Sequence, residues 1–68
     1  MNYLIWSQEY LDTADMMQKV IDKLNARRKG ASKTEKKELE DKIYKYRGYR
    51  GECLRIAAIL RSRHREAA

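Results

Sequence analysis

Hydrophobic residues in the first part of the chain recur at alternating steps of three and four, the period of a helix that packs against other helices. This series consists of Tyr3, Trp6, Tyr10, Thr13, Met17, Val20 and Leu24. A second row runs beside it and consists of Leu4, Leu11, Ala14 and Ile21. The pattern predicts a helix over residues 3–28. Its apolar face is wider than one partner helix covers.

A second series with the same alternating steps occupies the last part of the chain. It consists of Leu39, Ile43, Tyr46, Arg50, Cys53, Ala57, Leu60 and His64. This pattern predicts a helix over residues 34–65. Tyr46 and Tyr49 are expected to face the core, and Tyr44 is expected to face solvent. Gly48 and Gly51 would each cost ~1 kcal/mol relative to Ala inside a helix. Because the series keeps its phase across them, one continuous helix is favoured over a break that gives three helices.

The residues between the two series contain signals that end one helix and begin another. Arg27, Arg28 and Lys29 would lie in the last turn of the first helix, where the helix dipole favours cations. Gly30 suits a left-handed C-terminal cap, and the segment from Ser32 to Glu35 is typical of a capping box. Asn2 is suited to cap the first helix. Since so short a connection joins antiparallel neighbours, an antiparallel helical hairpin is expected.

Length and composition indicate how such a hairpin is stabilised. The chain has 68 residues, so residues 1–68 are expected to form a single domain. A domain of this size buries only ~60% of its unfolded surface. One Cys cannot form an intrachain disulfide, and one Cys with one His cannot form a four-ligand zinc site. Self-association into a dimeric four-helix bundle with coiled-coil packing is therefore expected. The residues expected to mediate it are Trp6, Tyr10, Met17, Val20, Leu24, Leu39, Ile43, Tyr46, Arg50, Cys53, Ala57 and Leu60.

Four residues suggest how the assembly is made specific. Ile5, Met16 and Ile59 lie outside the two apolar series, which predicts a second apolar surface for a partner protein. Arg50 lies within an apolar series, where a single polar residue often sets register or oligomeric state. It would pair with an acid such as Asp15 or with a partner chain. Alternatively, it extends along the edge of the series to reach solvent.

The charge of the chain is unevenly distributed. The net charge is +6, with −2 in residues 1–24, +4 in residues 25–38 and +4 in residues 39–68. Two basic clusters are candidates for phosphate contacts. They consist of Arg27, Arg28, Lys29, Lys33, Lys36 and Lys37, and of Arg61, Arg63 and Arg65. In a hairpin they lie at opposite ends, which suits nucleic acid less well than one continuous basic face. Nucleic-acid binding is the alternative function.

The arrangement of reactive side chains does not favour catalysis. Cys53 and His64 are separated by ~16 Å along a helix, too far for a nucleophile–base pair in one chain. Glu9, Asp12 and Asp15 recur at every third residue but lack the Glu-x-x-His motif of di-iron bundles. We therefore expect a non-enzymatic interaction or regulatory module without a metal or cofactor.

The longest apolar runs, Tyr3–Trp6 and Ile56–Leu60, are too short to cross a membrane or to form a signal-peptide core. A single thiol without a disulfide framework fits a reducing compartment. A cytoplasmic location without membrane contact is expected.

Two resemblances add expectations. The segment Ser7-Gln8-Glu9-Tyr10-Leu11-Asp12 resembles the Ser-Gln-Glu-Leu-Asp signature of the small sporulation aspartyl-phosphate phosphatases, which are also short helical hairpins. It departs from that signature by the additional Tyr10, which rotates Leu11 and Asp12 by ~100° around the helix. The resemblance implies phosphatase action on a phospho-aspartate, with Asp12 as the residue to test.

The layout of the whole chain is also similar to that of small uncharacterised helical proteins of Firmicutes prophages and mobile elements. The similarity rests on an opening Tyr3-Leu4-Ile5-Trp6 with Glu9-Tyr10-Leu11, and on a later Glu52-Cys53-Leu54 with Leu60-Arg61. This resemblance implies no activity.

Overall fold

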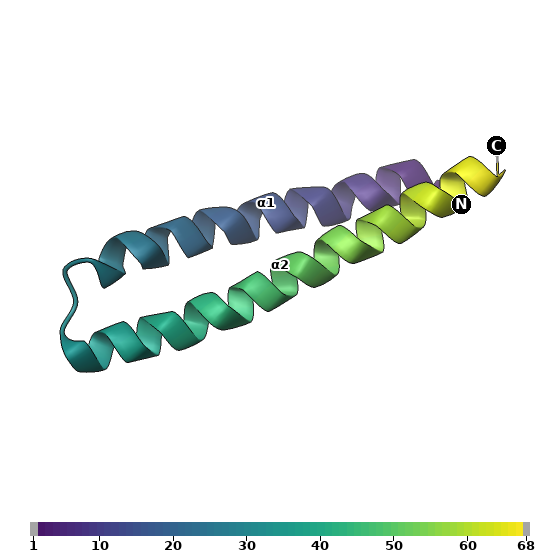
Figure 1. Cartoon of the computed structure of the whole chain (residues 1–68). Helices are drawn as coiled ribbons and strands as arrows, with labels where there is room; N and C mark the ends of the chain where they lie inside the picture. Colours follow the sequence, from purple (N-terminus) through teal and green to yellow (C-terminus); the bar gives the residue numbers. More distant parts are fainter. Residues whose placement is uncertain (1, 68) are drawn as a thin grey trace.

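Two long helices form an antiparallel hairpin in the computed structural model, which describes residues 2–67. The first helix, α1, spans Tyr3–Arg28, and the second, α2, spans Lys33–Ala67. The loop lies at one end and both termini lie at the other (Figure 1). The Cα atoms extend over 53 × 14 × 13 Å. The predicted all-α hairpin is confirmed, and α2 begins one residue earlier and ends two residues later than expected.

The helix starts are capped as the sequence indicates. The Ile5 backbone N–H donates to Asn2 Oδ1 at 3.1 Å. At the start of α2, the Glu35 backbone N–H donates to Ser32 Oγ at 3.3 Å. Each cap satisfies one of the N–H groups that a helix start leaves without a carbonyl partner.

The end of α1 differs from the expectation. No described residue has a positive φ, so the predicted left-handed cap at Gly30 is wrong. The C-cap is Lys29 in right-handed geometry. The Gly30 and Ala31 backbone N–H groups donate to the carbonyl oxygens of Arg27 and Arg28, each at 3.3 Å. These i→i+3 bonds tighten the last turn and satisfy its carbonyls, so a left-handed residue is not required.

The glycines of α2 do not interrupt it. The helix continues through Gly48 and Gly51, both of which are exposed, as the unbroken phase of the apolar series predicted. With 35 residues against 26, α2 is the longer helix. Its C-terminal turn projects beyond the start of α1 (Figure 1).

The contact between the helices is a seam that follows the predicted series in α2 as far as Leu60. In α1 the seam combines residues of both predicted rows. In α2, Leu39, Ile43, Ala57 and Leu60 are buried, and Tyr46, Arg50 and Cys53 are half-buried. In α1, the buried residues are Ser7, Ala14, Ile21 and Leu24, and the half-buried Tyr3, Tyr10 and Met17 alternate with them.

Trp6 and Thr13 of the predicted α1 series are exposed and lie beside the seam. The wide apolar face offers two seams one residue apart. The seam that forms contains the small side chains of Ser7 and Ala14, which allow the backbones to approach closely. Trp6 is too large for that space and lies beside the seam. The buried Ser7 hydroxyl donates to the Leu4 carbonyl at 2.8 Å, so burial does not leave it unpaired.

The hydrophobic core is concentrated near the loop. Ile21, Leu24, Leu39 and Ile43 form its buried cluster, and Val20, Ala31 and Tyr46 pack against that cluster.

Tyr49 is 53% exposed, so its predicted place in the core is wrong. Tyr49 lies beside the seam, in the same row of α2 as Ile56. Its ring packs edge-on against the Tyr46 ring, and the two ring centroids are 6.3 Å apart. Tyr44 is 81% exposed, which confirms the expectation for that residue.

Candidate interaction surfaces

Two flanks remain on the hairpin, one on each side of the seam. In an antiparallel helix pair, each flank combines one row from each helix. A surface hollow lined by Val20, Lys42 and Tyr49 marks one flank. A second hollow, lined by Leu11 and Leu54 among others, marks the opposite flank. Residues seven apart extend each row along its helix.

The first flank is called the aromatic flank. Its residues are Trp6, Glu9, Thr13, Met16, Val20, Lys23 and Arg27 of α1, and Glu35, Glu38, Lys42, Lys45, Tyr49, Glu52, Ile56, Ile59, Arg63 and Glu66 of α2. Large apolar side chains here are strongly exposed: Trp6 by 40%, Met16 by 67%, Tyr49 by 53% and Ile59 by 47%. The predicted exposure of Met16 and Ile59 is confirmed. Ile5, 60% exposed, lies outward between the flanks.

Charges on the aromatic flank balance overall but separate along its length. The half near the loop carries four bases and two acids, a formal charge of +2. The half near the termini carries Glu9, Glu52 and Glu66 with Arg63, a formal charge of −2. The flank is thus neutral and polarised from end to end.

The opposite flank is called the basic flank. Its residues are Leu4, Leu11, Asp15, Gln18, Asp22 and Asn25 of α1, and Lys33, Lys37, Glu40, Tyr44, Arg47, Leu54, Ala58, Arg61 and Arg65 of α2. With five bases and three acids, its formal charge is +2, and three further cations, Arg28, Lys36 and Arg50, lie in the adjacent seam rows. Arg28 and Glu40 approach each other across the helices at 3.6 Å, with both side chains largely exposed.

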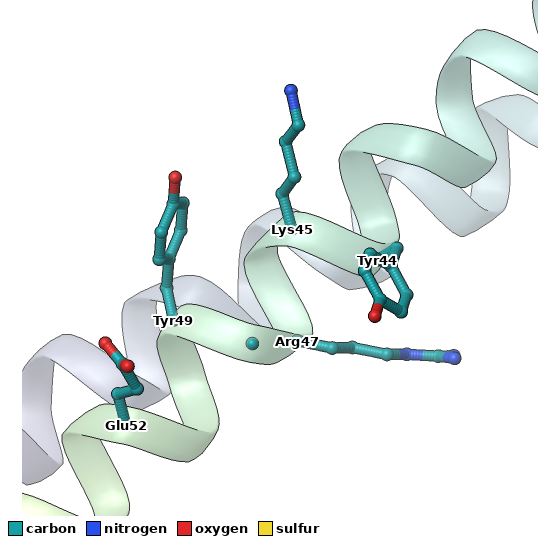
Figure 2. A pocket seen from close by; sticks show the side chains of 6 residues that line it. Tyr44, Lys45, Arg47, Tyr49 and Glu52 are labelled. Carbon is teal, nitrogen blue, oxygen red and sulfur yellow. The ribbon is translucent and has the colours of Figure 1, made fainter.

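Side-chain directions around Gly48 separate the two flanks. Lys45 and Tyr49 extend toward the aromatic flank, whereas Tyr44 and Arg47 extend toward the basic flank (Figure 2). Between them lies an open hollow on the outward side of α2, at the position of Gly48. A Cβ added at Gly48 or Gly51 would have no described atom within 4 Å outside its own helical neighbourhood. The side chains around this hollow diverge, so they do not enclose a small molecule.

The basic residues predicted to contact phosphates occupy opposite ends of the hairpin. Arg47 of the basic flank and Arg50 of the seam lie between the two clusters. Arg27 and Arg63, by contrast, belong to the aromatic flank. The signal for this flank was the seven-residue repeat at positions 33, 40, 47, 54 and 61, in which Lys33, Arg47 and Arg61 are basic. It became recognisable only after burial had identified the seam.

Arg50 is half-buried on the seam, as predicted. Ile21 and Ile43 belong to one buried cluster, so the antiparallel arrangement places Arg50 near the level of the small Ala14. Its Nε atom is buried and has no hydrogen-bond partner among the described residues. Within residues 2–67 it forms no ion pair, so the predicted pairing with Asp15 of the same chain is wrong. A role for Arg50 in assembly specificity stays a prediction.

Residues considered for catalysis or metal binding do not converge. Cys53 is half-buried and His64 is exposed. Residues 2–67 contain no group of three His, Cys, Asp or Glu side chains that could hold a metal ion. Asp12 is exposed and accepts a hydrogen bond from Gln8 Nε2 at 3.0 Å. No helix in the described range is long and apolar enough to cross a membrane.

No protein-family model, curated protein or solved structure matches this chain. The resemblances to sporulation phosphatases and to prophage proteins stay predictions.

Proposed function

We propose that the chain is a non-enzymatic interaction module that associates with a second copy of itself through the aromatic flank, forming a four-helix bundle. The exposure of Trp6, Met16, Tyr49 and Ile59 on one flank carries this proposal. Within residues 2–67 only seven hydrophobic residues are buried, and two of them are alanines. A second layer of helices would cover the remaining apolar side chains and increase the buried area that stabilises the fold.

The dimensions of the flank suit a stable dimer. The hairpin is 53 Å long and 14 Å wide, measured between Cα atoms. A face of that size is comparable to the ~800 Å² that each partner contributes to a standard interface. The neutral charge of the aromatic flank also favours self-contact, whereas two basic flanks would repel each other.

The charge polarity favours one orientation of the two copies. If they pack end for end, the +2 half of each flank lies over the −2 half of the other. If loop packs over loop, like charges meet at both ends. Each exposed ion pair is worth only ~0–1 kcal/mol, so the charges select the orientation while apolar burial supplies the affinity.

Light scattering after gel filtration, over a range of protein concentrations, tests this proposal. We expect a mass twice that of the 8.1 kDa chain. Met16→Glu combined with Ile59→Glu is expected to give a helical monomer, because the new carboxylates would be buried unpaired in the bundle. Tyr44→Glu is the matched control on the basic flank and is expected to leave the dimer intact.

Two outcomes would contradict self-association through this flank. One is a monomeric wild-type protein at every concentration. The other is equal loss of the dimer in the Tyr44→Glu control. Circular dichroism verifies that the variants stay folded. If the glutamate variant unfolds, Met16→Ser with Ile59→Ser replaces it and is expected to weaken the dimer without adding charge.

A further inference from the structure

We propose that the basic flank binds the phosphate backbone of single-stranded nucleic acid. This function lies beyond self-association and uses the opposite side of the hairpin. The first observation is the segregation of charge: +2 on the basic flank against zero on the aromatic flank, with three more cations, Arg28, Lys36 and Arg50, in the seam rows between them. Solubility alone does not require this segregation, because bases distributed over all faces would provide the same net charge.

The second observation is that cations recur along a rigid rod. Arg47 of the basic flank and Arg50 of the adjacent seam lie between the lysines at the start of α2 and Arg61 and Arg65 at its end. Because α2 is one unbroken helix, the spacing of these cations is fixed over most of the 53 Å length. A fixed row of cations matches a polymer with regularly spaced phosphates and gains affinity by releasing the counterions of that polymer.

The third observation is that most of these cations have no partner in the described chain. The two ion pairs found within residues 2–67 join Arg28 to Glu40 and Arg55 to Glu52, so in this range none of the five bases of the basic flank is paired. Arg50 has a buried Nε without a hydrogen-bond acceptor. A bound phosphate near the seam would supply an acceptor for the Arg50 guanidinium and relieve repulsion among its neighbours.

The occupant is a nucleic acid rather than an anionic membrane, because the flank lacks a continuous apolar strip. Leu4, Leu11 and Leu54 lie in the half near the termini, whereas Gln18 and Asn25 occupy the corresponding row near the loop. A membrane-surface helix buries an apolar face along its whole length. On the basic flank, cationic residues occur along the whole length, whereas apolar residues occur only in the half near the termini.

Features around Gly48 favour a single strand. Tyr44 is 81% exposed beside Arg47, so its ring is free to stack on an unpaired base (Figure 2). Gly48 and Gly51 leave open space next to it, which allows a strand to approach the helix backbone. Base stacking on an aromatic side chain together with phosphate contacts is the usual mode of single-strand binding.

Fluorescence anisotropy with a labelled single-stranded oligonucleotide, over a series of salt concentrations, tests this inference. Arg47→Gln with Arg61→Gln removes two charges from the basic flank. Lys42→Gln with Lys45→Gln removes two charges from the aromatic flank and is the matched control. We expect the first pair to raise Kd at least tenfold and the control to raise it by less than about threefold. The slope of log K against log salt should fall by about 1.4 for the arginine pair, at ~0.7 per phosphate contact.

Tyr44→Ala separates stacking from charge. We expect it to weaken binding of the single strand by about fivefold or more and to leave binding of a duplex of the same length unchanged. An equal effect of both charge pairs, or no oligonucleotide binding, would overturn the inference. Binding to vesicles with anionic lipid but not to the oligonucleotide would overturn it in favour of a membrane. Light scattering tests self-association and fluorescence anisotropy tests nucleic-acid binding. A failure of one proposal is therefore distinguishable from a failure of the other.

Discussion

At the scale of single residues, the glycines of α2 are not required by the hairpin. Glycine lowers helix stability because its backbone loses more conformational freedom on folding than that of other residues. Gly48 and Gly51 lie in helical geometry, with open space where a Cβ would be. No close approach within the chain explains them. The open surface that they provide is consistent with a ligand on the outward side of α2.

Gly48→Ala and Gly51→Ala are each expected to increase the free energy of unfolding by about 1 kcal/mol. Urea denaturation, followed by circular dichroism, measures this change. Ala58→Gly is the matched reverse substitution at an exposed position of the same helix and is expected to lower stability by a similar amount. Destabilisation by either alanine would show that the hairpin needs its glycines.

At the scale of the helices, the two halves of the seam are built differently. Near the loop, large aliphatic side chains fill the space between α1 and α2. Near the termini, the seam contains Ser7, Ala14 and Ala57, each only 1% exposed. Small residues allow close helix contact but bury little apolar area. Trp6 and Ile59 of the aromatic flank also remain exposed in that half, so a partner that covers them would add most to the buried apolar area there.

Ala14→Leu is expected to destabilise the hairpin by about 1–3 kcal/mol, because three added carbon atoms have no space in a closely packed seam. Thermal denaturation at a fixed protein concentration measures the change. Thr13→Leu places the same side chain at the adjacent exposed position and is expected to have little effect on folding. Equal stability of the Ala14→Leu and Thr13→Leu variants would contradict close packing around Ala14.

At the scale of the whole molecule, the hairpin has two chemically different sides. The proposed dimer would leave a basic flank on each outer face of the four-helix bundle. The two proposed activities are therefore compatible in one assembly. A dimer would also present two cationic surfaces, which raises its avidity for a polymer that contacts both.

The end-for-end arrangement predicts which residues meet at the two-fold axis. In that arrangement α1 packs against α1 of the partner, and Met16 lies near the middle of α1. Met16→Cys in a Cys53→Ser background is therefore expected to form an intermolecular disulfide on mild oxidation, as seen on a non-reducing gel. Ile5→Cys in the same background is a similarly exposed control and should stay reduced. If both variants formed the disulfide, or if neither did, the end-for-end arrangement would be contradicted, because a disulfide requires two Cα atoms within ~7 Å of each other.

The sequence by itself determined the two helices, their N-terminal caps, the short loop and most of the seam of α2. These features depend on local propensity and on the repeat of apolar residues, both of which are visible in the chain. Only the tertiary structure decided which of two adjacent rows of α1 forms the seam. The row that forms the seam is the one whose side chains fit between the two backbones. Because Ser7 and Ala14 occupy the seam, Trp6 and Thr13 lie on the aromatic flank. The basic flank became visible for the same reason, because a surface that combines two helices is defined only when their rotation about the seam is fixed.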